Sequence, residues 1–183
     1  MEHVRSRIQA TAMALLFAVG LLGGRGALAA PTAQQVEAVF LFYFSQFVEW
    51  PPGSFTDRTS PIVIGVLGDD PFDGSLDQAV AGGRVNGRRV VVRRLKSLSQ
   101  ATGCHILYIS SSEAAQLAQI MSALKGRKVL TVSDLGGFVQ SGGMIRFVLI
   151  DQHVRLVINP QAAEAAGLKL SSKLLRAAAP GEG

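Results

Sequence analysis

Short uncharged runs rich in β-branched residues alternate with helical segments through the middle of the chain. The runs cover Ile62–Leu67, Val90–Val92, Ile106–Ile109 and Val129–Val132. A continuous apolar strand is typical of a sheet buried on both faces, which is the arrangement of parallel sheets covered by helices. We therefore expect an α/β fold in which a mostly parallel sheet is flanked by helices on both faces.

Capping residues and apolar periodicity delimit the expected helices. They cover Gln34–Val48, Pro71–Ala81, Ala114–Leu124, a segment from Pro160 to about Ala166, and a last short helix from Ser171 or Ser172 to about Ala178. Asp70 is the expected N-cap of the second helix, and Ser110 with Glu113 forms an expected capping box for the third. The segments Met144–Ile150 and Val154–Ile158 predict an antiparallel hairpin at one edge of the sheet.

The N-terminus has the pattern of an export signal. Arg5 and Arg7 precede the uncharged segment Ile8–Leu22, and Ala27-Leu28-Ala29 follows as a small-x-small cleavage site. The apolar segment is shorter than the roughly 20 residues of a membrane span, so a cleaved signal is favoured over an uncleaved anchor. We expect a signal peptide over residues 1–29, cleavage after about Ala29, and a single domain over residues 30–183 in the bacterial periplasm.

The formal net charge of +5 does not indicate a nucleic-acid ligand. An exported protein rarely meets nucleic acid, and the basic residues are dispersed apart from the stretch Arg84–Arg94. The single cysteine, Cys104, excludes a disulfide within the chain. Its position before the apolar run at Ile106 favours a half-buried small hydrophobe, with an intermolecular disulfide or a reactive thiol as the alternative.

Patterns that indicate catalysis or metal binding are weak. After the signal the chain has two histidines, His105 and His153, and neither has a partner at ligand spacing. No G-x-S-x-G elbow occurs. We therefore expect no enzyme activity, no metal site and no cofactor.

Polar residues follow the ends of several expected parallel strands. Asp69, Ser111 and Ser133 occupy such positions, where open α/β sheets bind ligands, so they form a predicted ligand pocket. Helix capping by the neighbouring Asp70 and Ser110 is the favoured explanation of this polar cluster.

Aromatic side chains gather in the first expected helix and just after it. The residues that recur at helical spacing and are expected to face the core are Val36, Phe40, Tyr43, Phe44 and Phe47. Phe42 falls on the opposite face, where a large apolar residue predicts contact with a partner or with a second copy of the chain. Leu41 and Trp50 complete the predicted partner-binding set. Burial of Phe42 beneath a neighbouring loop is the alternative.

Six short segments follow one another along the chain in a characteristic order. They are Phe47–Pro51, Ile64–Phe72, Cys104–Ile109, Val129–Asp134, Gly142–Ile145 and Gly167–Leu175. In this order and spacing they resemble the YfiR-like family of periplasmic proteins, over roughly residues 33–178. The resemblance implies a repressor that binds the periplasmic sensor domain of an inner-membrane diguanylate cyclase, whose release raises cyclic di-GMP and favours biofilm formation.

The resemblance also implies dimers and redox-sensitive disulfides. The chain departs from the second property, because Cys104 has no other cysteine to pair with. Two further classes of function stay open on the sequence alone. One is a small-molecule binding module that serves a transporter or sensor, and the other is a hydrolase of the cell envelope.

Overall fold

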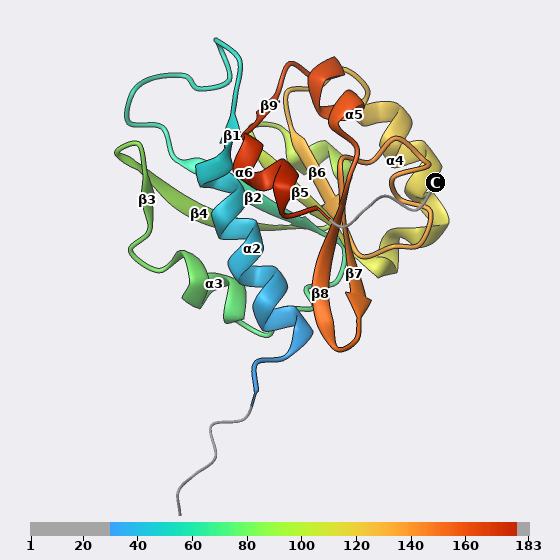
Figure 1. The fold of residues 1–183 in the computed structure, drawn as a ribbon. Helices are drawn as coiled ribbons and strands as arrows, with labels where there is room; N and C mark the ends of the chain where they lie inside the picture. The colour runs from blue at the N-terminus through green and yellow to red at the C-terminus, as the bar shows by residue number, and fades with distance from the viewer. Residues whose placement is uncertain (1–29, 179–183) are drawn as a thin grey trace, which may run out of the picture. The chain divides into compact units, whose positions relative to one another are not determined.

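Seven strands hydrogen-bond in the order β3-β4-β2-β5-β6-β7-β8 in the computed structural model (Figure 1). They are β2 (Ile62–Leu67), β3 (Arg84–Val85), β4 (Arg88–Leu95), β5 (Ile106–Ile109), β6 (Leu130–Ser133), β7 (Ile145–Ile150) and β8 (His153–Ile158). From β4 to β7 all neighbours are parallel, whereas β3 and β8 pair antiparallel at the two edges. The predicted sheet and its C-terminal edge hairpin are confirmed.

The structure describes residues 30–178. The predicted signal peptide, residues 1–29, lies outside the described residues. The described residues from Pro31 to Ala178 form one compact unit. Within the described residues, every helix is too short or too polar to cross a membrane.

Helices cover both faces of the sheet. They are α2 (Ala33–Phe47), α3 (Ser75–Val80), α4 (Leu117–Leu124), α5 (Pro160–Ala165) and α6 (Ser172–Arg176), with the short 3₁₀ helices η2 (Leu98–Ala101) and η3 (Ser111–Gln116). Because successive strand residues point to opposite faces, β2 contributes to two separate cores. Ile64 packs with residues of α2 and α3, and Val63 packs on the other face with Ile120 of α4.

A second, two-stranded sheet joins the end of α2 to the C-terminal part of the chain. Strand β1 (Val48–Glu49) pairs antiparallel with β9 (Lys169–Leu170), and the Ser171 N–H donates to the Phe47 carbonyl at 2.9 Å. This pairing brings α6 beside α2 (Figure 1). The sequence did not predict it, because a two-residue strand carries no measurable periodicity.

Two helix starts differ from the prediction. Helix α3 begins at Ser75 rather than Pro71, because Asp73 and Gly74 adopt positive φ angles of 46° and 80° that interrupt a right-handed helix. Asp70 instead accepts the Phe72 N–H at 2.9 Å in a local turn. The segment after Ser110 begins as the 3₁₀ helix η3 and becomes α-helical only at Leu117.

Candidate functional site

Helix α2 buries a different face from the one its aromatic residues indicate. Ala38, Leu41 and Phe44 are fully buried, and the polar residues Glu37 and Ser45 on the same side are nearly so. The prediction that Leu41 contacts a partner is therefore wrong. The helix is apolar on nearly every side from Val36 to Phe47, so its sequence pattern could not identify the buried side.

Phe42 and Trp50, the other predicted contact residues, are half-buried. Phe42 lies against Gly83, where an added Cβ would come within 2.6 Å of its ring. A neighbouring segment thus covers Phe42, as the alternative interpretation expected. Trp50 donates its indole N–H to the His105 carbonyl at 3.2 Å and meets the Phe55 ring edge-on. Both side chains are largely occupied by contacts within the fold.

The exposed apolar face of α2 consists of Val39 and Tyr43, which are 42% and 45% exposed. Tyr43 lies 6.5 Å from the half-buried Phe47, ring centre to ring centre. Phe40 flanks the same face, stacks on Phe44 and meets the Phe147 ring at a tilt of 43°. Large apolar residues exposed together on one helix are typical of an interaction surface.

A groove of about 570 Å³ runs beside this face, between α2, strand β8 and the end of α6. Its apolar part is formed by Phe40, Ile150, Val154 and Leu156, and Arg155 and Arg176 line it as well. We call these six residues the α2 groove. Its wall is the edge strand β8, which is covered in part where Leu156 bridges to Ala178. The groove therefore combines apolar contact area with two positive charges.

The tip of the β7–β8 hairpin extends the apolar surface. Leu149 and Ile150 are 58% and 48% exposed. The connecting residues, Asp151 and Gln152, both have positive φ angles, 49° and 61°. This is the geometry of a tight two-residue turn that matches the twist of the two strands. The turn fixes the tip, so its two apolar side chains stand in solvent on a rigid element.

The predicted ligand pocket at the strand ends is only partly available. Ser133 is fully buried, and its hydroxyl donates to the Ile109 carbonyl at 2.7 Å and accepts the Leu135 N–H at 3.1 Å. Asp69 and Ser111 are exposed, and the Asp69 N–H bonds to the Ser112 hydroxyl at 2.9 Å. Ser133 supports its neighbouring loops and is not free to bind a ligand.

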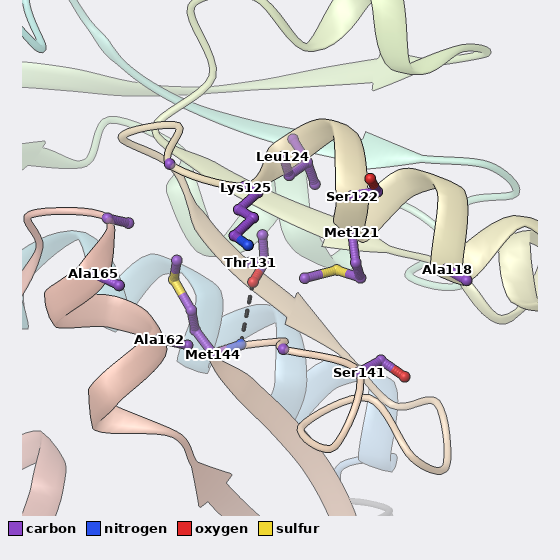
Figure 2. Close-up of a pocket in the computed structure, with 13 residues that line it drawn as sticks. Ala118, Met121, Ser122, Leu124, Lys125, Thr131, Ser141, Met144, Ala162 and Ala165 are labelled. Carbon is purple, nitrogen blue, oxygen red and sulfur yellow. Dashed lines mark hydrogen bonds between the residues drawn. The ribbon is translucent and has the colours of Figure 1, made fainter.

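A cavity of about 500 Å³ opens elsewhere, between α4, the glycine-rich loop before β7, and α5 (Figure 2). Its lining is mostly apolar and includes Met121, Leu124, Met144 and Ala162. Sequence reasoning missed it, because its residues come from four segments that share no motif.

Two buried titratable side chains, Glu37 of α2 and Tyr108 of β5, lie near the exposed Asp134. Glu37 is 8% exposed, and burial, reinforced by the nearby Asp134 charge, raises the pKa of its carboxyl to about 7. Burial also raises the pKa of the Tyr108 hydroxyl, with Asp134 and Glu37 as further causes. No group of three or more potential metal ligands occurs within residues 30–178.

Cys104 and His105 lie at the start of β5. Cys104 is buried, and burial raises the pKa of its thiol, so the reactive thiolate is disfavoured. The His105 imidazole accepts the Val63 N–H at Nδ1 and bonds to the Ser54 carbonyl through Nε2, at 3.1 and 3.0 Å. Burial lowers its pKa. Both residues support packing rather than chemistry.

The comparison with known families decides the assignment. A family described as YfiR/HmsC-like matches residues 34–179. The chain belongs to the YfiR/HmsC-like family. Members of this family are periplasmic and regulatory. A search of curated proteins finds no match.

The sequence placed Tyr43 among the core-facing residues of the first helix, whereas the structure exposes it. Glu37 and Ser45 lie on the buried face of α2 although they are polar, which the sequence pattern did not indicate.

Proposed function

We propose that this protein represses an inner-membrane diguanylate cyclase by binding its periplasmic sensor domain. The observation that carries the proposal is the exposed apolar surface made by Val39 and Tyr43 of α2, the α2 groove, and the hairpin tip. Membership of a periplasmic regulatory family supports it. Repression then follows from contact alone, without a chemical step.

Repression by contact requires a difference in affinity between two states of the receptor. A ligand that binds both states equally tightly shifts no equilibrium. The surface on α2 is carried by a helix whose other sides pack on the sheet and on α3, and the hairpin tip is held by its turn. A surface on such rigid elements favours the receptor conformation that it fits.

The surface also predicts what the partner presents. Tyr43 offers a large ring with a polar hydroxyl, the kind of residue that contributes most to protein interfaces. Arg155 and Arg176 line the adjoining groove, so an acidic rim on the receptor would complement them. We expect an apolar receptor segment that is flanked by acidic side chains.

The test measures repression of the cyclase by the Tyr43→Glu variant, expressed in a strain that lacks the native gene. Placing a charge at the centre of an apolar contact is expected to weaken receptor binding by about 30-fold or more. Intracellular cyclic di-GMP should then rise to the level of the deletion strain. Capture of the cyclase by the protein after cross-linking in the periplasm should fall in parallel.

Gln119→Glu is the matched control. Gln119 is an exposed residue of α4, on the opposite face of the sheet, and the substitution adds the same charge. It should leave cyclic di-GMP low. If Tyr43→Glu represses as well as the native protein does, the proposed surface is wrong, and if no cyclase is captured by any variant, the repressor role is wrong.

A second copy of the chain is the competing occupant of this surface, and the family resemblance implies dimers. Sedimentation velocity separates the two, because it measures self-association without the receptor. A native dimer that Tyr43→Glu converts to a monomer would assign the α2 face to the dimer and not to the receptor.

A further inference from the structure

The cavity in Figure 2 is formed by four segments between Ala118 and Ala166: α4, strand β6, the glycine-rich loop and α5. The side chains of Met121 and Met144 point into it from opposite sides, and Leu124 and the alanines of α5 complete an apolar lining. Its volume of about 500 Å³ lies within the roughly 300–1,000 Å³ of small-molecule sites. The cavity thus has the size and the lining to hold an apolar ligand body.

Its polar side chains are few: Ser122, Lys125, Thr131 and Ser141 line it. Lys125 is the only charged residue among those that line the cavity, and its side chain extends over Thr131 toward Met144 (Figure 2). Within residues 30–178, no carboxylate lies within ion-pair distance of its amine. The Thr131 hydroxyl accepts the Met144 N–H at 3.2 Å, and its own proton can still be donated.

We propose that this cavity binds a small amphipathic anion, with an apolar body of one alkyl chain or ring system and a single carboxylate. The body lies against the two methionines, whose flexible side chains adapt to varied apolar shapes. The carboxylate pairs with the Lys125 amine and lies within reach of Thr131. A single cation in a mostly apolar cavity selects a ligand with that charge distribution over a neutral or a cationic one.

This site is separate from the surface proposed for receptor binding. None of its lining residues belongs to α2 or to the hairpin tip. However, Met144 directly precedes β7, and its carbonyl accepts the Asn159 N–H at 2.8 Å at the base of the hairpin. A ligand in the cavity therefore touches the base of the hairpin whose tip contributes to the receptor surface.

The sequence provides a selective probe. Met121 and Met144 are the only methionines after residue 29, and both line the cavity. In protein purified from the periplasm with ¹³C-labelled methionine methyl groups, sub-micellar decanoate is expected to shift both methyl signals saturably. Decanol and decyltrimethylammonium, which share the alkyl chain, should bind about tenfold or more weakly, because they lack the negative charge.

Two pairs of variants locate the binding. Lys125→Glu should reduce decanoate affinity about tenfold or more, whereas Arg127→Glu, an equal charge change at an exposed site outside the cavity, should not. Ala165→Trp should block the cavity mouth for both decanoate and decanol, whereas Gln161→Trp, on the same helix but outside the lining, should block neither.

Several results would overturn the proposal: unchanged methyl signals in the native protein, equal affinities for decanoate and decanol, or equal losses in Lys125→Glu and Arg127→Glu. Because these measurements use the protein alone, they succeed or fail independently of the repressor role. If the protein binds decanoate but never represses a cyclase, the ligand site in the cavity is supported and the proposed receptor surface is wrong.

Discussion

Two titratable residues of the buried interior, Glu37 and His105, affect stability in opposite directions as the pH changes. Glu37 has a raised pKa in the folded protein, so the folded state binds more protons than the unfolded state between pH 4.5 and about 7. Its contribution to stability is complete below 4.5 and is lost as the pH rises through about 7. The ionised carboxylate then remains buried at a cost.

Glu37→Gln should therefore stabilise the protein at about pH 8, by up to about 3 kcal/mol, and have a small effect at about pH 4. Glutamine keeps the shape of the side chain and cannot ionise. Urea unfolding at the two pH values measures the difference. Asp134→Asn is the control, because it removes only the neighbouring charge and should lower the Glu37 pKa modestly. Equal effects of Glu37→Gln on stability at both pH values would contradict the raised pKa of Glu37.

His105 changes stability with pH in the direction opposite to Glu37. Its two hydrogen bonds fit the neutral ring protonated at Nε2, since Nδ1 accepts the Val63 N–H. Its pKa in the fold lies below 6.5, so the unfolded state takes up a proton first and stability is lost as the pH falls below about 6.5. In the His105→Gln variant, the loss of stability that His105 causes between about pH 7 and 5 should disappear. The gain in stability that Glu37 provides on acidification should then become visible. Chemical unfolding across this range, with the native protein beside it, is the measurement.

At the scale of elements, the packing of α2 against the segment after α3 depends on one glycine. A Cβ at Gly83 would lie 2.6 Å from the Phe42 ring and 3.0 Å from the Val80 carbonyl oxygen. Gly83→Ala should therefore destabilise the protein by about 1–3 kcal/mol. Adding Phe42→Leu, which shortens the facing side chain, should recover part of that loss. A double-mutant cycle from thermal or urea unfolding tests the coupling, and strictly additive effects would show that the two residues do not press on each other.

The central strands were largely predictable, because a buried parallel strand carries a continuous apolar run that few other elements share. Ile62–Leu67 and Ile106–Ile109 coincide with β2 and β5. The hairpin was predictable from two apolar segments around a polar turn. The boundaries of α3 were not, because the positive φ angle of Asp73 depends on local turn geometry that a capping pattern at Asp70 does not reveal.

The candidate site was less predictable than the fold. Periodicity identifies the buried side of a helix only when the other sides are polar, and α2 has apolar residues almost all round. Its orientation is decided by tertiary contacts: Phe44 stacks on Phe147 of β7 at 5.9 Å, and α3 covers the side that carries Phe42. The α2 groove joins Phe40 to residues beyond Ile150, and the cavity is lined by single residues of several elements, so no local pattern could indicate either.

At the scale of the whole molecule, charge should set how fast the protein finds its receptor. The chain is basic overall, and Arg155 and Arg176 line the groove beside the apolar face. In the repressor proposal, these charges steer an acidic receptor surface toward contact before the apolar side chains engage. Arg155→Glu with Arg176→Glu should lower the association rate by about tenfold or more at low ionic strength and change the dissociation rate less.

Biolayer interferometry with the immobilised periplasmic domain of the cyclase separates the two rates. Raising the salt concentration should slow association of the native protein toward the rate of the double variant, because screening removes the long-range attraction that the variant already lacks. Arg127→Glu with Lys128→Glu, remote from the groove, is the matched change in charge and should act weakly. If the Arg127→Glu and Lys128→Glu changes slow association as much as the Arg155→Glu and Arg176→Glu changes do, net charge alone guides the encounter. The position of the two groove arginines would then make no difference to the association rate.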